Sequence, residues 1–362
     1  MFLALFGGMN VAAFSQSSAP EIPFDFQSPL QMPPDLYLGE VAGIALNSKH
    51  HVFVFTRTGS DHGTSLLDGR AARLFEFGPD GKFVKEIGKN LYSMAWAHAV
   101  RVDKDDNIWL VDQGSDEVVE LSPDYKVKLI LGRRDEAREE RGRPQARRAP
   151  DTRPGWFYQP TDVAFDAQGN IFVSDGYGNS EVHKFDKDGH ILKATGTADK
   201  GSGPGQFNLP HSIAVDARGL VYVADRGNHR IEVLDNDLNY VREIRFDLPI
   251  PAGYVSNVPD FGRDETTGTY STLWPNTLCI SPGRTQYIYV NSMVPGKVYK
   301  FTLEGKLVGQ FGASGHRPGQ FGWIHGLACV SENEIWTGEL LTWRAQKITL
   351  HPAKTTDERT ER

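Results

Sequence analysis

A two-strand pattern that recurs six times constrains this chain more than any other feature of its sequence. Each copy alternates apolar and polar residues over two short runs separated by a polar turn, as in "HSIAVDARGLVYVADR" from His211. Alternation with a period of two predicts a β-hairpin. The copies start at Ala42, His98, Thr161, His211, Asn276 and His325. A repeat of this kind predicts a series of similar small sheets rather than one large sheet.

The spacing of the copies predicts four strands per repeat. Successive copies start about 50 to 65 residues apart, and further strand-like runs such as "EVHKFDKDGHILKATG" follow several of the hairpins. Their Asp-Gly turns are typical of tight hairpins. Six four-stranded units predict an all-β chain folded as a six-bladed β-propeller. A strand from about residues 20–40 is expected to pair with the last blade, which removes the exposed sheet edge.

The chain is expected to contain one propeller domain over residues 21–350, between two short terminal segments. Residues 1–20, "MFLALFGGMNVAAFSQSSAP", have an apolar stretch followed by small residues, as in an export signal, although the usual basic start is missing. Residues 351–362 form a polar tail. We therefore expect a secreted or periplasmic protein. No apolar run reaches the roughly 20 residues needed to span a bilayer.

Composition adds limits on partners and on cross-links. A net charge of -7 gives no reason to expect a nucleic-acid partner. The only two cysteines, Cys279 and Cys329, lie inside apolar runs, which predicts two buried free thiols and excludes a framework of several disulfides. Two insertions, residues 132–156 and 248–275, interrupt the repeats and are expected to border the same face of the ring.

The first positions of the repeats point to a metal site. In a propeller all innermost strands begin on one face, so these positions surround the mouth of the central channel. His98, His211 and His325 occupy alternate repeats, and alternate blades of a six-fold ring lie about 120° apart. Three neutral imidazoles with one vacant position are the arrangement of catalytic zinc, although imidazole also binds other divalent transition metals. The other eight histidines do not share this phase and are interpreted as surface residues, among them His51, His62, His183 and His229.

The second strand of each hairpin returns to the same face, so its end lies beside the histidines. Arg57 and Arg226 occupy the same late position in the first and fourth repeats, and Tyr177 follows it in the third. A guanidinium fits a substrate carboxylate, and a tyrosine beside cations could act as a base. Three aspartates recur one step earlier and are interpreted as holding the blades together: Asp112, Asp175 and Asp225.

The hairpins resemble NHL repeats, and roughly residues 38–340 resemble the peptidyl-α-hydroxyglycine α-amidating lyase family. The resemblance rests on "QPTDVAFDAQGNIFVSDGYGNSEV", "PGQFNLPHSIAVDARGLVYVADRGNHRIEV", "GKNLYSMAWAHAVRVDKDDNIWLVD" and "GQFGWIHGLA". It implies that His98, His211 and His325 hold zinc, that Tyr177 is the base, and that two arginines bind substrate. The implied arginines are Arg57 and Arg226. The implied reaction cleaves a peptidyl-α-hydroxyglycine to a peptide amide and glyoxylate.

The chain also departs from this family. Tyr158 and Gly178 stand where the animal enzyme has cysteines, and Gly326 replaces an aspartate expected directly after the third histidine. In the family that aspartate helps to bind a structural calcium ion, so the resemblance implies calcium only weakly here. The two insertions put the peptide specificity in more doubt than the chemistry.

Two other function classes remain open from the sequence. A non-catalytic NHL propeller would bind a protein or a carbohydrate and would hold no transition metal. A calcium-dependent lactonase or esterase propeller would place Glu, Asn and Asp side chains at the centre, where this chain has histidines. We expect a small-molecule or peptide substrate ending in an α-hydroxyglycine-like group. The physiological substrate and the oligomeric state remain open.

Overall fold

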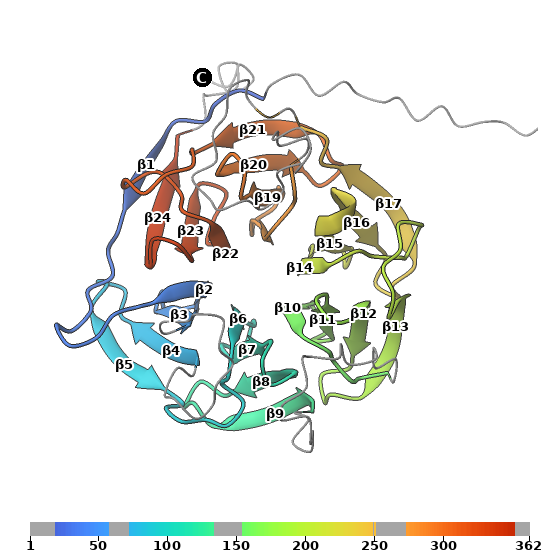
Figure 1. Cartoon of the computed structure of the whole chain (residues 1–362), viewed down its shortest axis with the longest axis horizontal. Coiled ribbons are helices and arrows are strands. Elements are labelled where there is room, and N and C mark those ends of the chain that lie inside the picture. The colour runs from blue at the N-terminus through green and yellow to red at the C-terminus, as the bar shows by residue number, and fades with distance from the viewer. Residues whose placement is uncertain (1–18, 58–71, 134–153, 249, 251–272, 352–362) are drawn as a thin grey trace, which may run out of the picture.

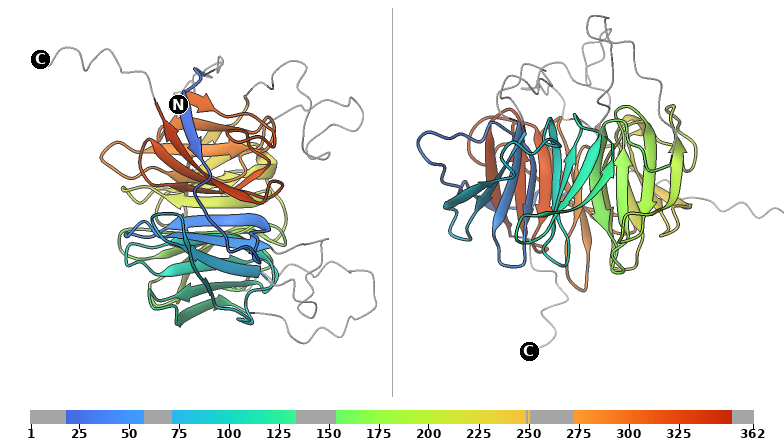
Figure 2. Two further views of the ribbon diagram at one scale, coloured as in Figure 1. Left: turned by 90° about the vertical axis from the view of Figure 1, so that its left-hand side faces the viewer. Right: turned by 90° about the horizontal axis from the view of Figure 1, so that it is seen from below.

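Six four-stranded antiparallel sheets surround a central axis and form a six-bladed β-propeller (Figure 1). This is a computed structural model, and it describes residues 19–57, 72–133, 154–248, 250 and 273–351. The edge views in Figure 2 show a thick disc. The predicted all-β, six-bladed fold is confirmed. The predicted export segment, both insertions and the C-terminal tail lie largely outside the described residues.

The first three blades follow one another along the chain, each running from an inner strand at the axis to an outer strand at the rim. Blade 1 contains β2 (Glu40–Leu46), β3 (Val52–Arg57), β4 (Ala72–Phe77) and β5 (Phe83–Ile87). Blade 2 contains β6 (Ala97–Val102), β7 (Ile108–Asp112), β8 (Glu117–Leu121) and β9 (Val127–Gly132). Blade 3 contains β10 (Pro160–Phe165), β11 (Ile171–Asp175), β12 (Ser180–Phe185) and β13 (Ile191–Thr197).

The last three blades repeat this order, and the sixth takes its outer strand from the start of the chain. Blade 4 contains β14 (Pro210–Val215), β15 (Val221–Asp225), the 3-10 turn η1 (Arg226–Asn228), β16 (Arg230–Leu234) and β17 (Tyr240–Arg245). Blade 5 contains β18 (Leu278–Ile280), β19 (Tyr287–Ser292), β20 (Lys297–Thr302) and β21 (Leu307–Phe311). Blade 6 contains β22 (Ile324–Cys329), β23 (Glu334–Glu339), β24 (Arg344–Leu350) and β1 (Phe24–Gln27). The described residues contain no helix long and apolar enough to cross a membrane.

The hydrophobic core is divided among the contacts between neighbouring blades. Six clusters of buried side chains each draw residues from two adjacent blades, as Phe55 of blade 1 packs in one cluster with Leu110 of blade 2. A sheet in the interior of the ring is therefore covered on both faces, which is why all five residues of β7 are buried. The blades hold one another in place, and the channel keeps a fixed geometry.

The ring closes as the sequence predicts, but the state of the two cysteines differs from the prediction. Strand β1 pairs antiparallel with β24, with Phe24 opposite Leu350. The prediction of two free buried thiols is wrong, because Cys279 and Cys329 form a disulfide. The two residues lie on the inner strands of blades 5 and 6 with their Cα atoms 5.8 Å apart, which is within bonding reach of two cysteines. Similar positions in neighbouring blades come together although 50 residues separate them.

A β-bulge at the start of the inner strands directs one side chain of each toward the axis. In five blades the register between the first two strands skips one residue, which is left without a partner opposite it. The skipped residues are Ala42, His98, Thr161, His211 and His325. A bulge bends its strand and redirects a side chain, so the repeat position identified in the sequence faces the channel.

We expect the fold to depend on β1. A chain lacking residues 1–31 exposes the edge of β24 and loses the contact between Phe24 and Phe311, whose ring centroids lie 5.6 Å apart. Burying one such ring contributes about 1.5 to 3 kcal/mol, so the melting temperature should fall by at least about 2 to 4 °C. Thermal unfolding and size-exclusion chromatography measure the loss and any association through the free edge. A chain lacking residues 1–18 is the control, and equal stability of the two truncated chains contradicts the closure.

Candidate metal centre

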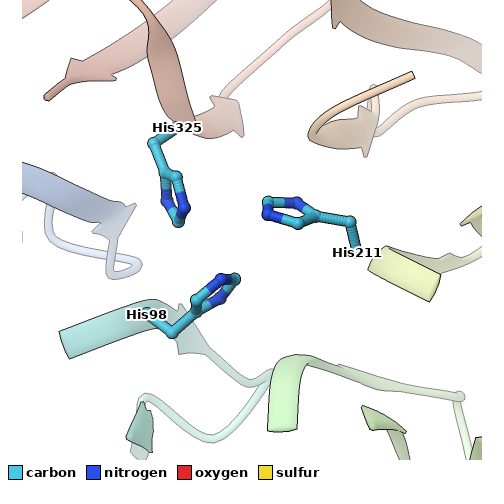
Figure 3. A group of neighbouring side chains, drawn as sticks. All are labelled: His98, His211 and His325. Carbon is cyan, nitrogen blue, oxygen red and sulfur yellow. The ribbon is translucent and has the colours of Figure 1, made fainter. Parts of the chain in front are cut away.

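Three histidines from alternate blades meet at the axis (Figure 3). His98 comes from β6, His211 from β14 and His325 from β22, and each is almost fully buried. Their ring centroids are 4.6 to 5.2 Å apart. One ring nitrogen from each lies within 4.8 Å of the others, close enough to bind one ion together. The structure thus brings together the three histidines that the repeat phase singled out.

The other three blades fix the orientation of these rings through their backbone. The Nδ1 atom of His98 donates to the carbonyl oxygen of Thr161 at 2.5 Å, and that of His211 donates to Asn276 at 2.8 Å. The Nδ1 atom of His325 donates to Ala42 at 2.7 Å. A carbonyl oxygen only accepts, so Nδ1 carries the proton and Nε2 keeps its lone pair free. Such an outer hydrogen bond fixes the tautomer of a metal-binding histidine.

Burial keeps the three imidazoles neutral. Burial is the largest cause lowering the pKa of His98 and His211 well below 6.5, and the charges of neighbouring histidines and arginines lower it further. Burial, followed by the charge of Arg57, lowers the pKa of His325 to about 3. Three neutral nitrogen donors with free lone pairs suit a divalent transition metal. The cluster could therefore hold such an ion.

Tyr177 lies directly beside the histidine nitrogens. Its hydroxyl oxygen is 2.9 Å from Nε2 of His211 and 3.4 Å from Nε2 of His98. Because Nε2 of His211 carries no proton, the tyrosine hydroxyl donates to it. The residue follows the end of β11, as its position in the repeat predicts. A phenol oxygen is thus available next to any ion held by the histidines.

The two predicted arginines lie around the same point, each against a tryptophan. The guanidinium of Arg57 is 4.7 Å from the ring centroid of Trp96, and its Nε donates to the Ala97 carbonyl at 2.7 Å. The guanidinium of Arg226 is 5.2 Å from the ring centroid of Trp274. Burial lowers the pKa of both arginines, and their interaction with Tyr177 opposes that shift.

The two cations differ in their carboxylate partners. Arg57 lies 3.7 Å from Glu40, whereas Arg226 forms no ion pair with a carboxylate anywhere in the described part of the chain. A buried cation without a counter-ion attracts an anion. The site is therefore prepared for a negatively charged ligand.

A cavity of about 510 Å³ contains these side chains. It is lined by Tyr177, both arginines, His325 and three tryptophans. The sequence prediction did not include the tryptophans Trp96, Trp274 and Trp323. Each lies two residues before the first position of a repeat, so a comparison of the residues just before each repeat would have found them. The cavity thus combines two arginines and one histidine of the cluster with three tryptophans.

The residues of the channel below the histidines do not fit a calcium ion. Gly326 offers no side-chain oxygen, and a Cβ atom there would lie 2.9 Å from the backbone nitrogen of Ile44. Arg101 already supplies a cation: its Nε and Nη2 donate to the buried Asp162 at 2.9 and 2.5 Å, and its Nη1 donates to the Leu327 carbonyl at 2.7 Å. The oxygens that a cation would need are thus satisfied by a guanidinium.

Two further predictions can be compared with the structure. His183 is not a surface residue, because its side chain is completely buried in blade 3. The other described histidines outside the cluster are half-buried or exposed, and His62 lies outside the described residues. Where the family has cysteines, the ring of Tyr158 packs so closely that a Cβ atom on Gly178 would lie 2.2 Å from it. Glycine is required at that contact.

Comparisons with known proteins agree with the predicted fold and family resemblance. The NHL repeat family matches residues 157–185 and 207–234. The chain is 28% identical over 246 residues to a probable peptidyl-α-hydroxyglycine α-amidating lyase of Caenorhabditis elegans, covering 64% of each chain. It is 34% identical over 327 residues to the peptidylglycine α-amidating monooxygenase of Rattus norvegicus, covering 76% of this chain and 32% of the relative. The chain thus spans under two thirds of the first relative and about a third of the second.

Solved structures share the propeller at low sequence identity. A gluconolactonase from Xanthomonas campestris aligns with a TM-score of 0.54 at 15% identity, covering 93% of this chain and 99% of that one. A streptogramin B lyase aligns with a TM-score of 0.52 at 16% identity, covering 91% and 98%. These two matches support the fold alone. The sequence relatives confirm the predicted resemblance to the peptidyl-α-hydroxyglycine α-amidating lyases.

We expect Arg101 to stabilise the channel in place of a metal ion. The change Arg101→Gln leaves Asp162, whose side chain is 2% exposed, as a buried charge without its partner. Such a loss costs about 3 to 5 kcal/mol of folding free energy. Chemical denaturation measures it, and Lys82→Gln, which breaks an exposed ion pair with Asp80, should leave stability unchanged. Calcium or a calcium chelator should not shift the melting temperature of the wild type, and a clear shift contradicts the assignment.

Proposed function

We propose that this relative of the peptidyl-α-hydroxyglycine α-amidating lyases is a metal-dependent carbon–nitrogen lyase. Its substrate would be a peptidyl-α-hydroxyglycine or a similar carbinolamide, and its products an amide and glyoxylate. One observation supports this proposal above all others: the Tyr177 hydroxyl lies beside a cluster of three neutral histidines, in a cavity that is also lined by one of them and by two buried arginines. Two of the relatives are named as peptidyl-α-hydroxyglycine α-amidating lyases.

The proposed reaction needs neither water nor a redox partner. The bond between the amide nitrogen and the α-carbon breaks, and its electron pair goes to nitrogen. The α-hydroxyl oxygen loses its proton and becomes the aldehyde oxygen of glyoxylate, while the nitrogen gains one proton. The enzyme therefore has to move one proton, hold one carboxylate and stabilise charge on two heteroatoms.

The donor set favours zinc, although other divalent transition ions also bind imidazole. His98, His211 and His325 would hold the ion through Nε2, because each Nδ1 is already bonded to a backbone carbonyl. When bound, the ion supplies Lewis-acid stabilisation of a developing negative charge on oxygen.

Tyr177 is proposed as the base. Its hydroxyl lies at hydrogen-bond distance from His211, and the charges of Arg57 and Arg226 act on it. Its phenolate can accept the α-hydroxyl proton. Tyr177 could then return this proton to the leaving amide nitrogen. Arg226 is proposed to bind the substrate carboxylate, since the described residues provide no carboxylate for it, and Arg57 would assist.

We also propose that the protein works outside the cytoplasm, in a secreted or periplasmic setting. The apolar start of the sequence supports this, as does the disulfide between Cys279 and Cys329. Disulfides form and persist mainly in oxidising compartments.

Purified protein is expected to release glyoxylate from α-hydroxyhippurate, and removal of its metal should abolish the release. His211→Ala should lower metal content and activity together. Tyr177→Phe should keep the metal and reduce kcat about 10²- to 10⁴-fold, because it removes the proton acceptor. Metal analysis and a glyoxylate assay check both changes, with Tyr240→Phe as a control at an exposed tyrosine. A protein without a transition metal and without product would instead favour the binding-module alternative.

Arg226→Gln is expected to lower kcat/KM for the same substrate about 10- to 100-fold, through loss of a charge-assisted contact of about 1.5 to 3 kcal/mol. A carbinolamide without the carboxylate, such as N-(hydroxymethyl)benzamide, should distinguish the variant from the wild type much less. Steady-state kinetics with both compounds measures the difference. An equal loss on both would show that Arg226 does not bind the carboxylate.

A further inference from the structure

We propose that blade 3 contains a second divalent-metal site, formed by Asp175, Glu181 and His183. Ligand atoms of the three residues lie within 4.8 Å of one another, and all three residues are buried. They lie on β11 and β12, apart from the three histidines at the axis. This site is independent of the proposed lyase reaction.

The strand register places these side chains together. Asp175 and Glu181 are directly opposite each other in the pairing of β11 with β12. His183 is two residues beyond Glu181, so its side chain points to the same face of the sheet. A diagonal neighbour in a sheet is still within reach of a long or aromatic side chain. The three groups therefore converge because of the sheet geometry and do not depend on a loop conformation.

His183 lacks the partners that a buried imidazole needs. Its side chain is 1% exposed, and neither ring nitrogen has a hydrogen-bond partner within the described residues. The nearest carboxylate oxygen, on Glu181, is 3.3 Å from Nε2. Phe157 and Phe185 flank the ring with centroids 5.4 and 6.4 Å away. Buried polar groups are normally satisfied, so these nitrogens indicate a ligand.

In two other blades, 4 and 6, the same register holds an arginine, whereas in blade 2 the residue opposite Asp112 is Glu117. In blade 4 the residue opposite Asp225 is Arg230, which pairs with Asp225 at 2.9 Å and also with Glu232. In blade 6 Arg344 is opposite Glu339 and pairs with it at 3.0 Å.

Blade 3 replaces this arginine by Glu181. Two buried carboxylates thus face each other, and across the described ranges no lysine or arginine forms an ion pair with either. Burying like charges without a cation is costly. A divalent ion would supply the positive charge that arginine supplies in blades 4 and 6.

The donor set selects the class of ion. One imidazole nitrogen with two carboxylates suits zinc or manganese, whereas calcium prefers six to eight oxygens. Asp175 also accepts hydrogen bonds from the Tyr158 backbone nitrogen at 2.9 Å and from Asn179 at 2.7 Å. It stands two residues before Tyr177, so an ion here would also fix the loop that carries that residue.

The test uses a chain in which the axial site has been removed by His98→Ala and His211→Ala. Metal-free protein of this kind, dialysed against zinc and analysed by mass spectrometry, is expected to retain about one zinc per chain. Adding Glu181→Gln or His183→Gln should reduce the content at least tenfold. His51→Gln is the matched control, since His51 also bonds a buried carboxylate, Glu76, at 2.7 Å, but in a pair without a third ligand.

A second readout covers the case that one variant fails to fold. Zinc should raise the melting temperature of the chain lacking the axial site, and a chelator should reverse this. Glu181→Gln, which keeps size and hydrogen bonding, should remove the effect. No retained zinc in the chain lacking the axial site overturns the proposal, as does zinc content unaffected by Glu181→Gln. If His183 instead carries a proton and pairs only with Glu181, the chain lacking the axial site will retain no zinc. None of these measurements requires lyase activity.

Discussion

The hydrogen bonds between each axial histidine and the next blade are the interaction on which the site depends. Blades 2, 4 and 6 supply an imidazole, and blades 3, 5 and 1 supply a backbone carbonyl that receives its Nδ1 proton. The ring therefore joins all six blades in alternation. Because each carbonyl lies in or just before the inner strand of a neighbouring blade, the orientation of the histidines is set by the packing between blades. Any change in the number of blades or their spacing would misdirect the three nitrogens.

Around this ring the protein buries charged and polar groups, which costs free energy that an apolar core would not require. It buries two arginines and a tyrosine hydroxyl beside neutral histidines, and it leaves Arg226 without a carboxylate among the described residues. Tryptophan faces offset part of this cost through their attraction to cations. In the channel below, the opposite solution applies, since Arg101 is fully paired with Asp162. Paired charges stabilise the structure there, whereas Arg226 has no carboxylate partner among the described residues.

Equivalent positions of the repeat serve different purposes in different blades. At the end of the second strand, blades 1 and 4 present an arginine to the cavity, and blade 3 presents Tyr177. At the start of the third strand, Arg230 and Arg344 form ion pairs with carboxylates of their own blades. Blade 3 has Glu181 at this position and His183 two residues later. The repeated backbone provides stability, and the variation between repeats supplies the chemistry. Differences from the repeat are therefore more informative than the repeat itself.

The sequence by itself determined the six-fold repeat, the closing strand, and the phase that gathers His98, His211 and His325 with Tyr177, Arg57 and Arg226. These follow from strand alternation and from side chains whose chemistry is visible in their residue type. Only the tertiary structure decided the carbonyl partners, the disulfide between Cys279 and Cys329, the tryptophan walls and the burial of His183. A backbone carbonyl has no residue identity, and the two cysteines and the blades around the cavity are brought together only by the packing of units about 50 residues apart.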